Sequence, residues 1–271
     1  MAYLKLLALA LAPGVAILLY LYFRDPHERE PPRVIARTFL AGALVAVPVL
    51  AVNFLVLEPI RARLGLTGVW AVMWQAFVSA GLTEEFFKFA GVLVTVYRSP
   101  NLSEPYDGIV YASALSLGFA TLENLVFVFT GGFATAWARA FLAVPGHALF
   151  GIAMGYYLGR ARFATAVRAR LRAWVLALAV PVAMHGAYDL LALHTDVEAL
   201  FYLLVPLMGF FFVRGARQLE AAVRESRPPS EPDGPAFGDP CPACGTPVLT
   251  GAYYCHRCGI PLRKEALLER S

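Results

Sequence analysis

Residues 69–96 (VWAVMWQAFVSAGLTEEFFKFAGVLVTV) form an apolar run long enough to cross a bilayer, yet Glu84, Glu85 and Lys88 lie near its middle. A membrane-spanning helix needs about 20 mostly apolar residues, and one charge at its centre costs roughly 2.5–3.5 kcal/mol. On a helix, Lys88 lies at i+4 from Glu84 and at i+3 from Glu85. The lysine can therefore offset one carboxylate and leave the other available for chemistry.

The composition places most of the chain in a membrane. Of its 271 residues, 59% are hydrophobic and 15% are charged, whereas a soluble domain is nearer half apolar and a quarter charged. Successive apolar runs predict an all-α polytopic protein, a bundle of about seven transmembrane helices. The predicted spans cover residues 3–23, 34–57, 69–96, 107–130, 139–159, 174–194 and 197–213.

The first span has the features of a retained helix rather than of a cleaved signal peptide. Its apolar core is longer than that of a signal peptide, and it ends in Tyr20, Tyr22 and Phe23, as interfacial aromatic belts do. We therefore expect residues 3–23 to stay in the mature protein.

Arginine and lysine placement predicts the orientation. Most basic residues lie in residues 24–33, 97–106 and 160–172 and after Arg214, four regions that share one side if there are seven spans. The positive-inside rule makes that side cytoplasmic, so the N-terminus is outside. We expect the plasma membrane of a bacterium or archaeon. The net charge of +4 includes no long basic or acidic block, so no nucleic-acid partner is expected.

The composition changes after the last span. The predicted domains are a membrane domain over 1–224, a flexible linker over 225–240 rich in Pro and Gly, and a zinc ribbon with its tail over 241–271. Two CxxC pairs can supply four thiolates to one tetrahedral zinc ion. Two disulfides are the alternative, but a cytoplasmic tail keeps its thiols reduced. The predicted zinc ligands are Cys241, Cys244, Cys255 and Cys258.

Ionisable or amide side chains occur inside four of the predicted spans. Any one of them can have a purely structural explanation, such as a hydrogen bond to a neighbouring helix. Four spans that each carry such a group are most economically explained by convergence on one buried polar site. The set is Glu84, Glu85, Lys88, Glu123, Asn124, His147, His185 and Asp189.

Two local patterns favour convergence. His147, Gly151, Gly155 and Gly159 recur every four residues, so they form one helical stripe along which another helix can approach closely. His185 and Asp189 are i,i+4, so the carboxylate can orient the imidazole. Simple glycine packing and an interfacial role for the aspartate are the structural alternatives.

Glutamate and histidine together are suited to activating water. A carboxylate can act as a general base, and histidine or asparagine can stabilise an oxyanion. The same residue types can also hold a divalent metal ion with one position open for water. The sequence has no HExxH and no GxSxG motif, so the templates of soluble metalloproteases and serine hydrolases do not apply.

Four motifs in order carry a resemblance to a known family. EEFFK (84–88), FATLEN (119–124), PGHALFG (145–151) and HGAYD (185–189) make the membrane region resemble the PrsW family of intramembrane proteases, which is related to the CAAX-prenyl-protease and bacteriocin-immunity group. The resemblance covers about residues 15–213. It implies a multispanning bundle that cleaves membrane-tethered proteins, such as an anti-sigma factor in stress signalling.

The resemblance also implies residue roles. Glu84 and Glu85 would be the catalytic pair, with the site completed by Glu123, His147 and His185. Lys88, Asn124 and Asp189 would support them. Because an i,i+4 Glu–Lys pair is favourable, we expect Glu84 to pair with Lys88 and Glu85 to act as the base.

Two other functions fit the same residues. Membrane Glu, Lys and His also relay protons in transporters, although no internal repeat typical of transporters is visible. A catalytically silent membrane scaffold that displays the zinc ribbon to a protein partner is the third hypothesis. In the protease interpretation the ribbon is an addition that recognises a partner or regulates access.

Overall fold

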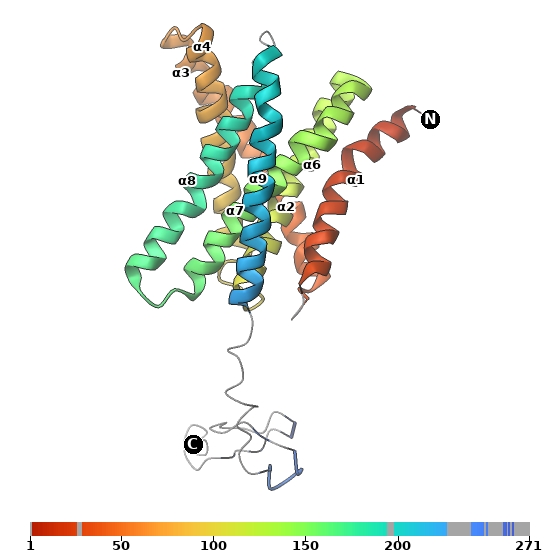
Figure 1. Cartoon of the computed structure of the whole chain (residues 1–271), viewed down its shortest axis with the longest axis vertical. Coiled ribbons are helices and arrows are strands. Elements are labelled where there is room, and N and C mark those ends of the chain that lie inside the picture. Colours follow the sequence, from red (N-terminus) through yellow and green to blue (C-terminus); the bar gives the residue numbers. More distant parts are fainter. Residues whose placement is uncertain are drawn as a thin grey trace. The chain divides into compact units, whose positions relative to one another are not determined.

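We describe a computed structural model of the chain, covering residues 2–25, 29–193, 198–226, 240–246, 248, 257–258, 260 and 262. The chain divides into two compact units, Met1–Ser226 and Arg227–Ser271. The first unit is a bundle of long helices (Figure 1). All four cysteines of the sequence fall within the second. No strand occurs in the described residues.

The helices of the first unit follow one another with short connections. Three π-helical segments, labelled η, each join two consecutive α-helices. In order they are α1 (Ala2–Arg24), α2 (Pro32–Val52), η1 (Asn53–Leu57), α3 (Glu58–Arg63), α4 (Gly68–Met73), η2 (Trp74–Leu82), α5 (Thr83–Thr95), α6 (Pro105–Ala138), η3 (Arg139–Ala143), α7 (Val144–Phe163), α8 (Val167–Ala192) and α9 (Glu198–Glu225).

Four helical stretches in the described residues are long and apolar enough to cross a membrane: Tyr3–Arg24, Pro32–Arg63, Pro105–Phe163 and Val167–Ala192. The third has 59 residues, roughly 90 Å of helix at 1.5 Å per residue and too much for one crossing. It contains a break at Gly132, whose φ is 72°. The all-helical class is therefore confirmed, and the count of seven spans stays a prediction.

Two connections differ from the sequence-based expectations. Residues 58–68 were expected to be a loop, but Glu58–Arg63 is helical and its first turn is held by a Glu58–Arg61 ion pair. The arginine-rich stretch 160–172 was expected to connect two helices, but α7 extends to Phe163 and α8 begins at Val167. Arginine is a good helix former, so polarity alone does not end these helices.

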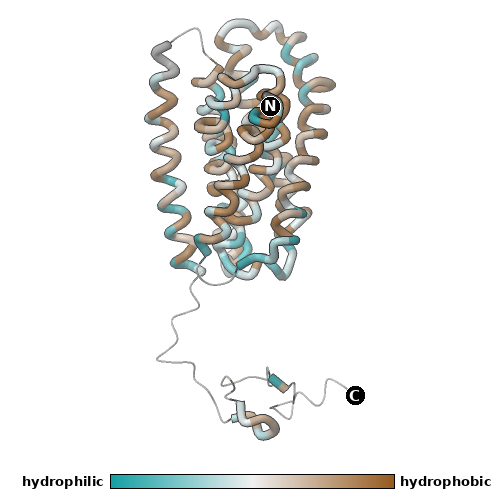
Figure 2. The backbone as a smooth tube through the Cα atoms, turned by 90° about the vertical axis from the view of Figure 1, so that its right-hand side faces the viewer, coloured by the Kyte–Doolittle hydropathy of each residue, from teal (hydrophilic) through white to brown (hydrophobic). Residues whose placement is uncertain are grey.

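Apolar side chains cover the outside of the helical unit. Val94 is 86% exposed and Leu44 is 70% exposed, as expected where the surrounding solvent is lipid. Figure 2 shows apolar residues along the helices and hydrophilic residues gathered at the lower connections. The ionisable groups Glu85 and Lys88 are fully buried. The polar residues of the bundle thus include a buried centre.

Helix α6 lies at the middle of the bundle and packs against α1, α2 and α7. Its contact with α7 is the stripe predicted from the glycine spacing. A Cβ atom at Gly155 would lie 2.2 Å from the carbonyl oxygen of Gly108, so the two backbones touch. One turn above Gly151, the carbonyl of His147 accepts a hydrogen bond of 2.7 Å from Ser116. The glycine stripe therefore positions His147 against α6.

Two π-helical segments end where the site helices begin. Segment η2 ends at Leu82, directly before Glu84 and Glu85 on α5, and η3 ends at Ala143, four residues before His147. Segments of this kind are frequent at functional sites because the extra residue in a turn rotates the side chains that follow.

In the second unit, Cys241 and Gly245 form a tight turn. The amide of Gly245 donates to the carbonyl of Cys241 at 2.8 Å, and Gly245 has a φ of 68°, which glycine adopts without strain. Cys255 and the predicted linker residues 227–239 lie outside the described residues.

Candidate active site

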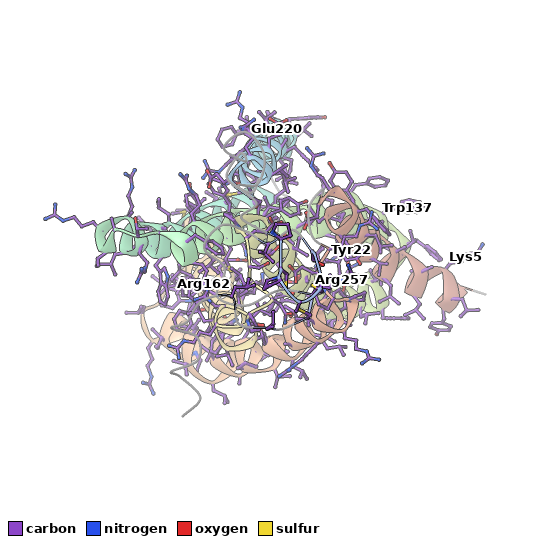
Figure 3. All side chains as sticks on the ribbon, turned by 90° about the horizontal axis from the view of Figure 1, so that it is seen from below. Lys5, Tyr22, Trp137, Arg162, Glu220 and Arg257 are labelled. Carbon is purple, nitrogen blue, oxygen red and sulfur yellow. The ribbon has the colours of Figure 1, made fainter. Side chains whose placement is uncertain are left out.

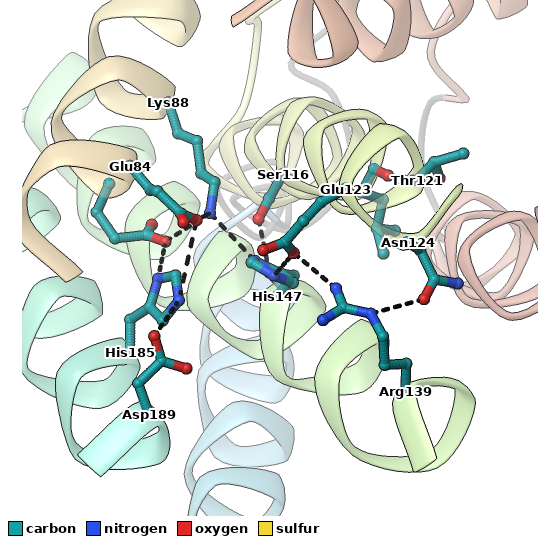
Figure 4. Close-up of polar contacts among 12 residues, drawn as sticks. Glu84, Lys88, Ser116, Thr121, Glu123, Asn124, Arg139, His147, His185 and Asp189 are labelled. Carbon is teal, nitrogen blue, oxygen red and sulfur yellow. Dashed lines mark hydrogen bonds and ion pairs between the residues drawn. The ribbon is translucent and has the colours of Figure 1, made fainter. Parts of the chain in front are cut away.

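The predicted polar residues meet inside the bundle. Figure 4 shows side chains from α5, α6, η3, α7 and α8 pointing toward one another. Of the eight residues predicted from the sequence, five form one hydrogen-bonded cluster with Lys88, and Asn124 and Asp189 lie at its two edges. The cluster consists of Glu84, Glu85, Lys88, Glu123, His147 and His185.

Lys88 is the hub of this cluster. Its ammonium group lies 2.8 Å from Glu85 Oε1, 3.2 Å from Glu84 Oε2 and 3.1 Å from His147 Nδ1. An ammonium group has three donors and no acceptor, so these three contacts use all of its hydrogens. The charge also lies 4.2 Å from the centre of the Phe119 ring, a favourable cation–π distance. A buried lysine is tolerated here because every hydrogen has a partner.

The two glutamates differ in a way that the sequence did not indicate. We expected Lys88 to pair chiefly with Glu84, but its shorter contact is with Glu85. Glu85 is fully buried and also bonds His185 Nδ1 at 2.9 Å, whereas the Glu84 side chain is 11% exposed. The helical spacing allows either pairing, and the position of His185 on α8 decides between them. The expected Glu84–Lys88 pair is present, but Lys88 lies closer to Glu85, which the sequence analysis had left free.

His185 links the two glutamates to α8. Its Nδ1 bonds Glu85, and its Nε2 lies 3.9 Å from Glu84 Oε2 and 3.6 Å from Asp189 Oδ2. The last two distances are too long for hydrogen bonds, so they orient the ring only electrostatically. Asp189 therefore faces the imidazole as predicted, but from the edge of the cluster.

His147 joins the lysine to the carboxylate of α6. Because Lys88 only donates, His147 Nδ1 must be the acceptor in that contact. The other nitrogen, Nε2, then carries the hydrogen and donates to Glu123 Oε2 at 3.0 Å. A carboxylate behind a histidine fixes its tautomer and orientation, so Glu123 positions His147.

Arg139 is a member of the network that the sequence analysis missed. From η3, it contacts Glu123 Oε2 at 2.7 Å and Asn124 Oδ1 at 2.8 Å. A signal for it was present, because the predicted site held four carboxylates and one lysine, an imbalance that requires another cation. The Asn124 amide donates onward to the carbonyl of Ala10 at 2.9 Å. Asn124 therefore anchors α1 and Arg139 rather than contacting the histidines.

Three described cysteines of the second unit also form a cluster. The sulfur atoms of Cys241, Cys244 and Cys258 lie within 4.8 Å of one another, and Cys241 Sγ is 3.6 Å from Cys258 Sγ, well beyond the roughly 2.05 Å of a disulfide bond. Hydrogen bonding with Thr246 lowers the pKa of Cys244 to about 6. A thiol with a lowered pKa readily provides the thiolate that metals prefer.

The helical unit therefore belongs to a definable class of protein. Its surface is apolar, several of its helices can cross a bilayer, and its buried centre contains the glutamates and histidines that activate water in hydrolases. These features are those of an integral membrane hydrolase.

Comparisons with known proteins specify the class further. Residues 30–214 match the family described as PrsW family intramembrane metalloprotease. The protease PrsW of Bacillus subtilis (strain 168) is 37% identical over 217 residues, covering 80% of this chain and 95% of the relative. That of Geobacillus kaustophilus (strain HTA426) is 43% identical over 189 residues, covering 70% and 80%. No solved structure matches the chain significantly.

The chain belongs to the PrsW family of intramembrane metalloproteases. The resemblance read from the four motifs is thereby confirmed, and the transporter hypothesis receives no support. The match ends at residue 214, so the cysteine-containing unit lies outside it.

Proposed function

We propose that the chain hydrolyses peptide bonds of membrane-tethered proteins at the centre formed by Glu84, Glu85, His147, His185 and Glu123. The observation that carries the proposal is the convergence of these groups, from the four helices α5, α6, α7 and α8, around the buried ammonium of Lys88. Family membership supports proteolysis as the reaction. A single-span anti-sigma factor, the kind of substrate that the family resemblance implies, is the first substrate to test.

Within this centre, Glu84 is the better candidate for the general base. Its side chain keeps some exposure and has the longer lysine contact, while Glu85 is held by both Lys88 and His185. A base must reach the proton of an attacking water, and of the two adjacent glutamates only Glu84 has a partly exposed side chain. This assignment reverses the one favoured by helical spacing alone.

The remaining groups hold and move protons. His185 Nε2 makes no contact short enough for a hydrogen bond with Glu84 or Asp189, so it is placed to relay a proton between Glu84 and the leaving amine. Glu85 fixes the ring of His185 through Nδ1. Lys88 balances the two carboxylates, and Glu123 fixes His147.

The same residues fit a divalent metal ion, as the family description implies. Glu84, His147 and His185 each offer a ligand atom within 4.8 Å of the others, a donor set that zinc accepts. Glu85 Oε2 is buried without a hydrogen-bond partner among the described residues. We propose that Glu84, His147 and His185 would hold such an ion, in which case Glu84 would serve as a ligand and not as the base. A bound zinc ion polarises a carbonyl and lowers the pKa of its water.

The proposal is tested with two matched variants of purified protein. Glu84→Gln should fold normally and cleave a single-span anti-sigma factor at least about 10³-fold more slowly. Glu85→Gln should lose thermal stability as well, because Lys88 and His185 both lose a charged partner. Glu220→Gln, on the exposed surface of α9, is the control and should match the wild type. Normal cleavage by Glu84→Gln would refute the assignment, and normal cleavage by both site variants would refute the protease site.

We also propose the predicted topology of seven spans, with the N-terminus outside and the tail in the cytoplasm of a prokaryotic cell. The α7–α8 connection and the end of α9 lie at one end of the helical unit and the start of α1 at the other (Figure 1), in agreement with this arrangement. Reporter fusions at residues 62 and 225 should read as outside and cytoplasmic. Two cytoplasmic signals would mean an extra or missing span.

For the second unit, we propose a structural zinc ion held by Cys241, Cys244, Cys258 and Cys255, with the ribbon binding a protein partner. The domain limits 1–224, 225–240 and 241–271 belong to the same proposal. Tetrahedral zinc with bonds of about 2.3 Å places its sulfur ligands about 3.8 Å apart, close to the 3.6 Å between Cys241 and Cys258. One zinc atom per chain in the purified protein is the expected result.

A further inference from the structure

A cleft of about 600 Å³ opens beside the α7–α8 connection, away from the candidate active site. Its lining comes from the end of α5, the residues that follow it, α7 and α8. One part of the lining is cationic and the rest is apolar or aromatic, and no acidic side chain belongs to it. The lining residues are Arg98, Arg162, Arg170, Leu93, Val94, Tyr97, Ala161 and Trp174.

Two of the three arginines in this cleft have no hydrogen-bond or ion-pair partner among the described residues. In the part of the chain that the structure describes, Arg98 and Arg162 make no hydrogen bond or ion pair, and both are exposed. Arg170 donates to the carbonyl of Ala164 at 2.9 Å. Figure 3 views the chain from below and labels Arg162 among the side chains of the helical unit. The cleft therefore presents guanidinium groups with free donors to a ligand.

Other arginines at the same end are satisfied within the chain. Arg160 contacts Glu225 at 3.3 Å and the Tyr156 hydroxyl at 2.8 Å. The difference matters because a positive-inside signal needs only charge, whereas Arg98, Arg162 and Arg170 also surround one cavity. Their arrangement is that of a binding site for an anion.

The apolar wall indicates what kind of molecule carries the anion. Val94 is 86% exposed on the outer surface of α5, where a membrane protein meets acyl chains. Trp174 donates to the Tyr97 hydroxyl at 2.9 Å, and such amphipathic aromatic pairs lie at the level of lipid headgroups. The cleft thus passes from cationic to apolar along the direction in which a phospholipid lies.

We propose that this cleft binds an anionic phospholipid, with its phosphate group between Arg98, Arg162 and Arg170 and an acyl chain along Leu93 and Val94. Arginine recognises phosphate through paired charge-assisted hydrogen bonds, and basic pockets between membrane helices bind acidic headgroups. Free inorganic phosphate shares the headgroup chemistry but does not use the apolar wall. The proposal is independent of the proteolytic function.

Native mass spectrometry and thermal melting of the full-length protein in nanodiscs test the proposal. Wild-type protein should retain phosphatidylglycerol in preference to phosphatidylcholine and melt at a higher temperature in its presence. The Arg98→Gln/Arg162→Gln variant should bind phosphatidylglycerol roughly 30-fold more weakly, from about 1 kcal/mol for each arginine. Its melting temperature in pure phosphatidylcholine should equal that of the wild type, which shows that it folds.

The matched control is Arg168→Gln, an exposed arginine of α8 that does not line the cleft. It should keep wild-type lipid binding. An equal loss in this control would reduce the effect to general surface charge and overturn the site. Equal retention of both lipids by the wild type would also overturn it. Inorganic phosphate added to phosphatidylcholine nanodiscs should change the melting temperature little, and a shift as large as that from phosphatidylglycerol would replace the lipid with a free anion.

Discussion

Two cationic regions of the helical unit differ in whether their charged groups have partners within the protein. At the buried centre, Lys88 gives all three of its hydrogens to Glu84, Glu85 and His147. In the arginine cleft, Arg98 and Arg162 have no such contacts in the described part of the chain. A buried charge must be compensated within the protein, whereas a charge at the membrane surface can be hydrogen-bonded by water or by a ligand. The centre is therefore self-contained, and the cleft is open to an outside anion.

The largest expected difference between the two regions is in the free energy of unfolding when one of their cations is removed. Lys88→Met keeps the length of the side chain but leaves Glu84 and Glu85 buried without a counter-charge, which should cost roughly 3–5 kcal/mol. Unfolding in detergent measures it. Arg98→Met, the control from the cleft, should change the free energy of unfolding by less than about 0.5 kcal/mol. Similar effects of the two substitutions would abolish the distinction between the regions.

Arg139 tests how far the compensation extends around the centre. Arg139→Gln leaves Glu123 and Asn124 without their cationic partner, so the orientation of His147 should loosen. We expect kcat to fall between about 10- and 100-fold, as for other residues that orient ligands and bases, with little change in KM. The exposed Arg168→Gln variant is the control for a change in charge alone. A rise in KM without a fall in kcat would mean that Arg139 serves substrate binding instead.

The glycine stripe allows the packing around the buried centre to be tested against that of an open surface. Gly155→Ala places a Cβ atom against the backbone of Gly108, so α6 and α7 must separate at a cost of about 1–3 kcal/mol. Gly209→Ala on α9 meets nothing within 4 Å and should be neutral or stabilise the helix by up to about 1 kcal/mol. Equal melting temperatures for the two variants would show that the contact between α6 and α7 is not tightly packed.

The smallest effect on the membrane centre should come from the second unit. Cys241→Ser with Cys244→Ser should remove zinc from the tail, as measured by metal analysis, and leave cleavage of a minimal single-span substrate within about twofold. The reason is that all residues of the cluster around Lys88 belong to the first unit. Complete loss of cleavage at normal expression would instead make the ribbon part of the catalytic unit.

Much of this protein is determined by its sequence. Apolar runs dictate helices in a bilayer because lipid offers no partner for backbone polar groups. The four-residue spacing of His147, Gly151, Gly155 and Gly159 predicted the close contact between α7 and α6. The high free-energy cost of burying Glu84, Glu85 and Lys88 in a membrane indicated a functional site around them. The order of the four motifs identified the family. Charged residues within an apolar run can therefore be recognised from the sequence as candidates for a functional site.

Only the tertiary structure decided how those residues share their charges. Helical spacing lets Lys88 reach either glutamate, and it was the position of His185 on α8, 100 residues further along the chain, that drew Glu85 into the tighter pairing. Arg139 joined Glu123 and Asn124 because the break at Gly132 and the π-helical turn η3 bring it back against α6. Spacing along the chain fixes which partners are local, but contacts between distant helices are set by packing, and the roles of the two glutamates depend on those contacts.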